Sequence, residues 1–435
     1  MTAVASVETR DRDAAIDRYR AVRDLGGRLA APLSAEDAQV QTMPDVSPTK
    51  WHLAHVTWFF ETFLLHPQLP EYAAFDPAYG YLFNSYYEAL GPRHARPQRG
   101  FLSRPSLAEI LDYRAYVDTT MARLILEAPD PVWDAIAPMV ELGLHHEQQH
   151  QELLLTDIKH VLSCNPLNPA YADPAPAATA GAAAPLRWVA VPGGIHEIGH
   201  DGTGFAFDNE GPRHQVPLRD CRLASRPVTN GEFRDFVADG GYAEPRHWLS
   251  DGWATLRQEG WTAPFYWRRE DADGPWREFT LHGLRPLDPA APVSHLSFYE
   301  AAAYAAWAGA RLPTEAEWEV AASRLPRPLE RGANLLESGR LHPAPAAEDD
   351  GDGSGLRQMI GDVWEWTQSS YAPYPGFRTA EGAVGEYNGK FMCNQMTLRG
   401  GSCVTPPGHV RITYRNFFYP HQRWQVTGLR LAQDA

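Results

Sequence analysis

The feature that most constrains this chain is a change of pattern near its middle. Up to about residue 162, apolar residues recur at intervals of three and four, the period of amphipathic helices. From residue 188 onward, short β-like runs such as WVAVPGG and HQVPL alternate with turns. Between these halves lies a Pro/Ala tract, residues 165–187, with little to bury, which is typical of a linker. We therefore predict two domains, residues 1–164 and 188–435. A length of 435 residues also exceeds the roughly 250–300 that one core usually serves.

The first half predicts a bundle of four helices. Its periodic segments cover residues 14–33, 47–65, 106–126 and 132–162. Ser47 and Pro48 fit the N-cap and the first turn of the second helix. Between the second and third helices, residues 67–105 form a long irregular stretch rich in Tyr, Arg, Gly and Pro. Loops of that length inside a compact domain are usually functional, so we expect this one to contribute to a site.

The second half predicts an irregular α+β domain. Two helices are expected in it, one over SFYEAAAYAAWAG and one over TEAEWEVAA. The remainder reads as short strands and turns held by aromatic packing, because glycine, proline and tryptophan concentrate there.

Composition excludes several function classes. The chain has 39 Lys+Arg against 54 Asp+Glu, a net charge of −15, which argues against nucleic acid as a partner. Its four cysteines form no C-x-x-C pair and are too scattered for a disulfide framework. No apolar stretch approaches 18 residues, and the first twenty residues lack the apolar core of a signal peptide. We predict a soluble cytoplasmic protein with no membrane partner.

The strongest chemical signal is the run HHEQQHQE at residues 145–152. His146 and His150 are four residues apart, so a helix points both imidazoles to one side, where they can share a metal ion. The predicted second helix offers His52 or His55 as a third ligand. Three neutral imidazoles suit iron, zinc or copper alike.

The histidine run also matches the HExxH pattern of zinc peptidases, with Glu147 as the base. That reading explains neither the second histidine helix nor the large C-terminal half. His145 and His160, the remaining histidines of this helix, are expected at the surface rather than at the metal.

Five motifs together resemble a known family. In chain order they are SPTKWHLAHVTWFFETFLL, HHEQQHQE, GDVWEWTQSSYAPYPGF, LRGGSC and YRNFF. They resemble the ergothioneine-type sulfoxide synthases, which are non-haem iron enzymes. The resemblance implies an N-terminal DinB-like four-helix bundle followed by a C-terminal formylglycine-generating-enzyme-like domain of C-type-lectin fold. That domain would form part of the substrate pocket, and Trp318, Trp364 and Trp366 of its signature motifs would lie in its core.

The same resemblance implies a ligand set and contacts for hercynine, the histidine-betaine substrate. The iron(II) ligands fall on His55, His146 and His150, with His55 preferred over His52 as the histidine of the LAH element. The contacts with the hercynine imidazole fall on Gln149 and Tyr387. The contact with the trimethylammonium end is assigned to Asn416, and the neighbouring Phe417 adds a ring face for a cation–π contact.

The donor side departs from the mycobacterial type, which uses γ-glutamylcysteine. That type has Trp-Asp after the asparagine, whereas this chain has Phe417 and Phe418. The loop FNSYYEALGPRHARPQRG resembles instead the type that takes free cysteine. By that resemblance Tyr86 and Tyr87 are catalytic residues facing the oxygen chemistry, and Arg96 and Arg99 bind the carboxylate of the donor.

The function implied is iron(II)- and O2-dependent formation of a C–S bond at C2 of the hercynine imidazole, giving a sulfoxide in ergothioneine biosynthesis. Cysteine is the preferred donor. One alternative is a selenoneine synthase that attaches a selenosugar to the same carbon. Two further alternatives are a zinc-dependent DinB-type thiol transferase and a noncatalytic lectin-like binding module.

Overall fold

The computed structural model describes residues 11–173, 183–271, 273–347, 353–380, 385 and 388–435. By their internal contacts these residues form two compact units. The helical unit takes in the chain up to Asn165 and two later segments, His200–Gly211 and Phe377–Lys390. The mixed unit comprises Pro166–Gly199, Pro212–Gly376 and Phe391–Ala435. The sequence alone assigned the two later segments to the C-terminal domain.

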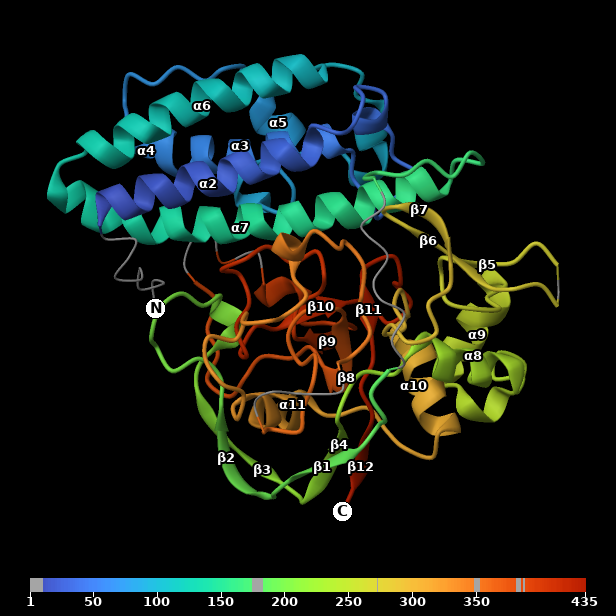
Figure 1. Cartoon of the computed structure of the whole chain (residues 1–435). Coiled ribbons are helices and arrows are strands. Elements are labelled where there is room, and N and C mark those ends of the chain that lie inside the picture. Colours follow the sequence, from blue (N-terminus) through green and yellow to red (C-terminus); the bar gives the residue numbers. More distant parts are fainter. Residues whose placement is uncertain (1–10, 174–182, 272, 348–352, 381–384, 386–387) are drawn as a thin grey trace. The chain divides into compact units, whose positions relative to one another are not determined.

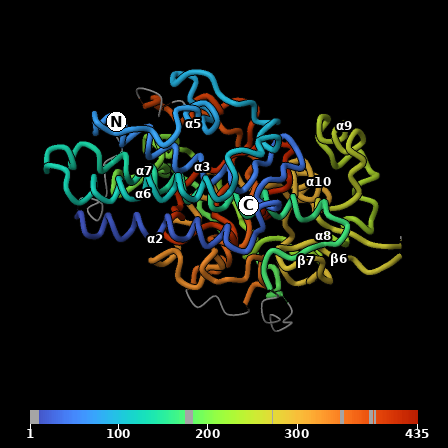
Figure 2. Tube along the Cα trace, turned by 90° about the horizontal axis from the view of Figure 1, so that it is seen from above, coloured from blue at the N-terminus to red at the C-terminus, as the bar shows by residue number. Residues whose placement is uncertain are grey.

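The helical unit is the predicted four-helix bundle (Figures 1 and 2). Its four long helices are α2 (Arg12–Ala30), α3 (Thr49–Phe60), α6 (Leu107–Glu127) and α7 (Asp130–Ser163). Two short helices, α4 (His66–Gln68) and α5 (Tyr79–Phe83), lie between α3 and α6 in the chain. Helix α3 packs against both α6 and α7, and α2 packs against the same pair. A single π-helical turn, Glu61–Leu65, joins α3 to α4.

Local chemistry explains where these helices begin. Asp11 caps α2, and Ser106 caps α6 in a reciprocal box with Glu109. The prediction that Ser47 caps α3 is wrong, because the N-cap residue is Pro48 and no side chain caps that end. The backbone N–H of Ser47 donates instead to the Asp157 carboxylate on α7, at 2.7 Å. The Ser47 hydroxyl is also engaged outside the helix, since it accepts from Arg99.

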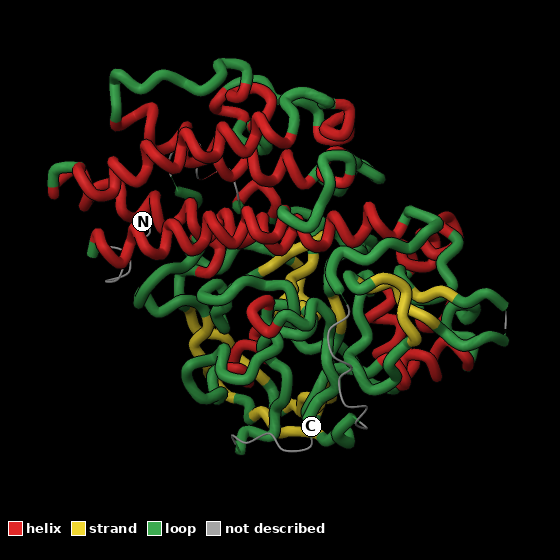
Figure 3. The backbone as a smooth tube through the Cα atoms, turned by 45° about the horizontal axis from the view of Figure 1, so that its top comes forward, coloured by secondary structure: helices red, strands yellow, loops and turns green. Residues whose placement is uncertain are grey.

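The mixed unit confirms the predicted irregular α+β character, with short strands among long loops (Figure 3). Its helices are α8 (Asn230–Ala238), α9 (Ser250–Glu259), α10 (Phe298–Trp307) and α11 (Glu315–Ala322). Helices α10 and α11 are the two that the sequence predicted, and capping boxes begun by Ser297 and Thr314 start them.

The strands of the mixed unit form four small sheets. A three-stranded antiparallel sheet has the order β1 (Trp188–Val191), β4 (Cys221–Ala224), β12 (Ala432–Asp434). A four-stranded sheet has the order β10 (Asn416–Phe418), β9 (Met396–Arg399), β8 (Trp364–Ser370), β11 (Thr427–Gly428), with β11 parallel to β8. The remaining strands pair as β2 (Gly194–Ile198) with β3 (His214–Leu218), and as β5 (Trp267–Arg268), β6 (Arg277–Thr280) and β7 (Gly283–Pro286).

The three tryptophans of the signature motifs lie in the core of the mixed unit, as predicted. Trp318, Trp364 and Trp366 are at most 2% exposed. The Trp318 indole N–H donates to the Glu365 carboxylate at 2.8 Å, and Arg430 donates to the same carboxylate at 2.6 Å. These buried polar groups satisfy one another, which is the condition for keeping charge inside a core.

No helix among the described residues combines the length and apolar character needed to cross a bilayer.

Candidate metal centre

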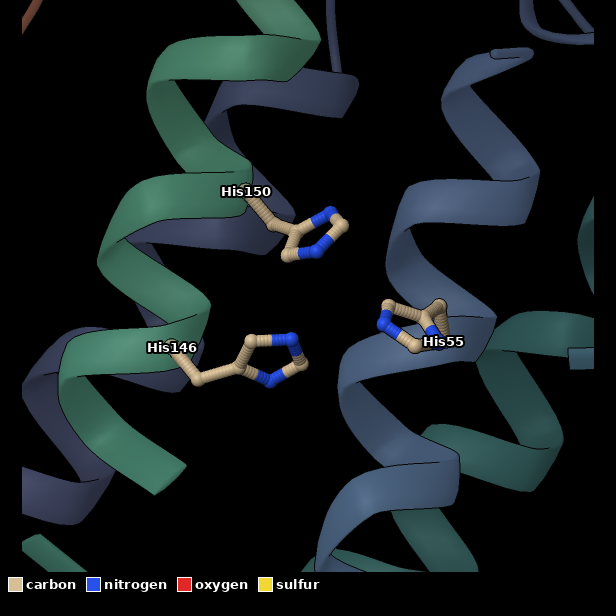
Figure 4. Close-up of side chains that lie close together, drawn as sticks. All are labelled: His55, His146 and His150. Atoms are coloured by element: carbon tan, nitrogen blue, oxygen red, sulfur yellow. The ribbon is translucent and has the colours of Figure 1, made fainter. Parts of the chain in front are cut away.

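Three imidazoles converge inside the helical bundle (Figure 4). His55 projects from α3, and His146 and His150 project from successive turns of α7. Their ring centroids are 4.7 to 5.0 Å apart in all three pairs. One nitrogen from each ring lies within 4.8 Å of the other two. This is the only such cluster of potential metal ligands among the described residues.

Burial keeps these imidazoles neutral, which is the form that binds a metal. His55 and His146 are almost fully buried, and His150 is 9% exposed. Desolvation lowers the pKa of His146 to about 3. Desolvation, and secondly the neighbouring His146, hold the pKa of His55 and of His150 well below the usual range. Protons therefore compete little with a cation for these nitrogens near neutral pH.

His55 is held rigidly on α3. Its ring is stacked between Trp51 and Trp58, with centroid distances of 4.6 and 5.5 Å and nearly parallel planes. Its Nδ1 lies 2.6 Å from the Phe83 carbonyl oxygen, so Nδ1–H donates and the lone pair of Nε2 is left for the cluster. The two tryptophans lie four residues before and three after His55, a helical spacing through which the sequence could have identified them.

His52, the other candidate for the third ligand, does not belong to the cluster. Its Nδ1 lies 2.9 Å from Nδ1 of His150, and its Nε2 lies 3.0 Å from the Asp157 carboxylate. It is therefore a buried partner of a potential ligand. The structure thus brings His55, and not His52, together with His146 and His150.

Glu147 does not act as the base of an HExxH site. One of its carboxylate oxygens accepts from Arg23 at 2.8 Å, and the other accepts from Arg114. A carboxylate committed to two buried guanidinium groups is not available to bind water at a metal. The zinc-peptidase reading therefore lacks its catalytic residue.

The expectation that His145 and His160 lie at the surface is wrong, since they are 2% and 6% exposed. His145 contacts Arg18, with Nε2 to Nη2 at 2.8 Å, and its ring stacks on Phe205 at 3.8 Å. His160 contacts the Thr42 hydroxyl at 2.6 Å. Helix α7 is covered around most of its circumference, so a polar residue on it need not face solvent. Neither histidine belongs to the metal cluster.

Arg99 is a buried guanidinium that forms no ion pair with any described carboxylate. It donates to the hydroxyls of Ser47 at 2.9 Å and Ser85 at 3.1 Å, and it stacks over Trp51 at 3.3 Å. Its Nε has no hydrogen-bond partner. Burial lowers the pKa of Arg99 to about 9, since nearby charges do not compensate its desolvation. Such a group favours an incoming anion.

The other residues of this loop lie near Arg99. Arg96 donates to the Tyr86 hydroxyl at 3.1 Å and to the Asp45 carbonyl. Tyr87 is buried against Trp58 and Phe63, with ring centroids at 5.6 and 5.2 Å. Because Trp58 also stacks on His55, aromatic contacts connect Tyr87 with the histidine cluster.

The residues expected to contact hercynine lie in both units. Gln149 is half-buried on α7, between His146 and His150. In the mixed unit, the Asn416 amide oxygen accepts from the Phe417 backbone N–H at 2.9 Å. The Phe417 ring stacks on Tyr371 at 4.1 Å and on Phe391 at 6.0 Å, two neighbours that no sequence pattern indicates. Tyr387 lies outside the described residues.

Comparisons with known proteins cover both units. Residues 18–154 match the DinB superfamily, and residues 176–435 match the Sulfatase-modifying factor enzyme 1-like domain. A hercynine oxygenase of Mycolicibacterium smegmatis is 35% identical over 97% of this chain and 99% of that protein. One of Mycobacterium tuberculosis is 35% identical over 92% and 94%. A formylglycine-generating enzyme of Streptomyces coelicolor is 31% identical over 61% of this chain and 97% of that protein.

Proposed function

The chain belongs to the hercynine oxygenase family, the ergothioneine-type sulfoxide synthases, and from this we propose that it oxygenates hercynine in ergothioneine biosynthesis. The proposed reaction joins the sulfur of cysteine to C2 of the hercynine imidazole and yields a sulfoxide. The observation that carries the proposal is the cluster of three buried, neutral histidines in a chain related to these enzymes over nearly its full length.

The reaction balances with one molecule of O2. The S–H bond of cysteine and the C2–H bond of the imidazole break, and a C–S bond and an S–O bond form. Thiol and imidazole together lose four electrons, and O2 gains four. One oxygen atom enters the sulfoxide, and the other leaves as water with the two hydrogens.

The histidine cluster fits a metal cofactor. Three nitrogens within 4.8 Å of one another lie at most about 3 Å from a common centre, so small rotations bring them to the bond length of about 2 Å that imidazoles make with first-row metals. Iron(II) held by His55, His146 and His150 would supply the redox chemistry that O2 requires and would place the two substrates side by side. Glu147 is excluded from this set by its two arginine partners.

We assign the donor carboxylate to Arg99, with Arg96 in support. The support for this assignment is that Arg99 is buried and its guanidinium has neutral hydroxyl partners. A carboxylate would complete a charge-assisted, forked contact there. The Arg99 guanidinium and the His55 ring both stack on Trp51, at 3.3 and 4.6 Å from its ring centroid, so the proposed anion site shares a neighbour with the metal ligands.

We assign proton delivery during oxygen reduction to the tyrosine loop. The Tyr86 hydroxyl accepts from Arg96, which holds a phenol of the kind that can deliver a proton beside the proposed donor site. Tyr87 packs against Trp58, one of the two rings that hold His55. For hercynine we propose contacts by Gln149 and Tyr387 with the imidazole, and by Asn416 and Phe417 with the trimethylammonium group.

Reconstitution tests the proposal. Metal-free protein would be loaded with iron(II) or zinc(II) under nitrogen, mixed with hercynine and cysteine, and then exposed to air. Mass spectrometry should detect hercynylcysteine sulfoxide from the iron-loaded protein only. No product from iron-loaded protein, or equal turnover with zinc, would contradict the proposal.

A competition and a matched pair of variants sharpen this test. With cysteine, γ-glutamylcysteine and a selenosugar present together, the cysteine adduct should predominate, and a predominant selenium adduct would point to a selenoneine synthase. His146→Ala should abolish product formation. His160→Ala removes a buried histidine from the same helix outside the cluster and should retain product formation, because His160 contacts Thr42 and is not one of the three clustered histidines.

A further inference from the structure

Asp157 and His52 form a hydrogen-bonded chain that leads to His150, one of the three clustered histidines. The Asp157 carboxylate lies 3.0 Å from Nε2 of His52, and Nδ1 of His52 lies 2.9 Å from Nδ1 of His150. All three residues are buried, with Asp157 and His52 each 3% exposed. The Asp157 oxygen that contacts His52 also accepts from the backbone N–H of Ser47. The carboxylate is thereby anchored between α3 and α7.

The direction of each hydrogen bond follows from the chemistry of its ends. A carboxylate can only accept, so Nε2 of His52 carries the proton and donates to Asp157. An imidazole that donates through one ring nitrogen offers the other as an acceptor, so Nδ1 of His52 accepts. Nδ1–H of His150 then donates to Nδ1 of His52. His150 consequently keeps its lone pair on Nε2, the nitrogen that faces the other ligands (Figure 4).

We propose that Asp157 and His52 are positioning residues that fix the tautomer and ring orientation of His150 for metal binding. This inference rests on the proposed function, because it assumes a metal at the three histidines. His55 obtains the same control from a carbonyl, since its Nδ1–H donates to the Phe83 oxygen. Histidine ligands generally donate their second N–H to a carbonyl or carboxylate, and loss of that partner typically weakens metal binding 10- to 100-fold. In this chain His52 stands between the Asp157 carboxylate and the ligand His150, and hydrogen bonds to both.

A merely structural role for His52 predicts a different result. If His52 only fills space between α3 and α7, its replacement changes stability and leaves the bound metal undisturbed. If it orients His150, replacement changes metal affinity and the spectrum of the bound ion in protein that remains folded. The experiment must therefore measure the metal site directly, without substrate and without turnover.

Cobalt(II) is a suitable probe because its absorption and paramagnetically shifted proton resonances report on the ligands. Wild type, His52→Leu, Asp157→Leu and Asp157→Asn would each be titrated with cobalt against a competing chelator under nitrogen. His160→Leu is the matched control, a buried histidine of α7 that contacts Thr42 instead of a ligand. Circular dichroism confirms folding of each variant.

We expect His52→Leu and Asp157→Leu to bind cobalt 10- to 100-fold more weakly than wild type, and His160→Leu to bind it within about twofold. Asp157→Asn keeps an oxygen that accepts from His52, so its cobalt affinity should lie between those of wild type and Asp157→Leu. In wild type, two shifted imidazole N–H resonances should exchange slowly with D2O, one each from His55 and His150. In His52→Leu one of them should exchange rapidly.

Unchanged affinity and an unchanged spectrum in folded His52→Leu would overturn the inference. If His52→Leu fails to fold, the two Asp157 variants provide the test. Equal cobalt affinity of Asp157→Leu and wild type would also overturn the inference. If wild type itself binds no cobalt at these histidines, the proposed function fails instead, so the two failures are distinguishable.

Discussion

Replacing Arg99 with methionine separates a buried charge kept for a ligand from one kept for stability. Burial lowers the pKa of Arg99 to about 9, so near neutral pH the folded protein bears a desolvation cost of roughly 4–5 kcal/mol for its charge. Removal of the guanidinium forfeits hydrogen bonds to two serines and the stack on Trp51, together worth about 3–4 kcal/mol. The two terms nearly cancel. We predict that Arg99→Met changes the free energy of unfolding by no more than about 1–2 kcal/mol, and in the stabilising direction.

Arg23 offers the matched comparison. It is equally buried, and although burial opposes its charge, Asp118 and Glu147 raise its pKa above the usual value. Arg23→Met leaves Glu147 with one of its two buried partners, and breaking such a pair typically costs about 3–5 kcal/mol. Urea denaturation of both variants should therefore give clearly different free energies of unfolding.

The kinetic effect of Arg99→Met should be confined to the donor. A buried carboxylate that loses its charged partner loses about 3 kcal/mol of binding, so kcat/KM for cysteine should fall roughly 100-fold at saturating hercynine. The KM for hercynine should stay unchanged. Cysteamine, which lacks the carboxylate, should react equally well with both proteins. If Arg99→Met unfolds as easily as Arg23→Met, or keeps the preference of wild type for cysteine over cysteamine, Arg99 does not bind the donor carboxylate.

Three further predictions follow from named contacts. Gly143→Ala puts a methyl group 2.6 Å from an aromatic ring of α3 and should lower the free energy of unfolding by about 1–3 kcal/mol. Gly27→Ala meets nothing within 4 Å and should raise the free energy of unfolding by about 0.5–1 kcal/mol. Equal shifts of the two variants in urea denaturation would contradict this prediction. Tyr86→Phe or Tyr87→Phe should divert product from sulfoxide to oxidised thiol while iron affinity, measured by chelator competition, stays intact; unchanged product ratios in both variants would exclude the loop from oxygen chemistry. Burial raises the pKa of Asp362 to about 6, so between pH 4 and 6 the folded state binds more protons than the unfolded state. The free energy of unfolding should therefore fall by up to about 1.4 kcal/mol per pH unit as pH rises through this range. Asp362→Asn should flatten that pH dependence, and parallel curves for the two proteins would refute the prediction.

The sequence predicted the elements that depend on local pattern. The four bundle helices follow the period of their apolar residues, and the helices that begin after Ser297 and Thr314 have local capping signals. The pair His146 and His150 was visible for the same reason, because four residues make one helical turn.

Features that depend on tertiary contacts were not visible in this way. The choice between His52 and His55 is made by the rotation of α3 against α7, and spacing alone left it open. Ser47 resembles a cap, yet its backbone is satisfied by Asp157, 110 residues away in the chain. The burial of His145 and His160 depends on which elements cover α7, which their own neighbours in sequence do not determine.

In the proposed enzyme one metal ion, held by His55, His146 and His150, is the centre of hercynine oxygenation. An anomalous difference map at the iron edge, from crystals grown anaerobically with iron(II) and hercynine, locates this ion. We predict a single strong peak within bonding distance of one ring nitrogen each of His55, His146 and His150. A peak bonded instead to His52 or Glu147, or no peak at the cluster in iron-loaded active protein, would contradict it.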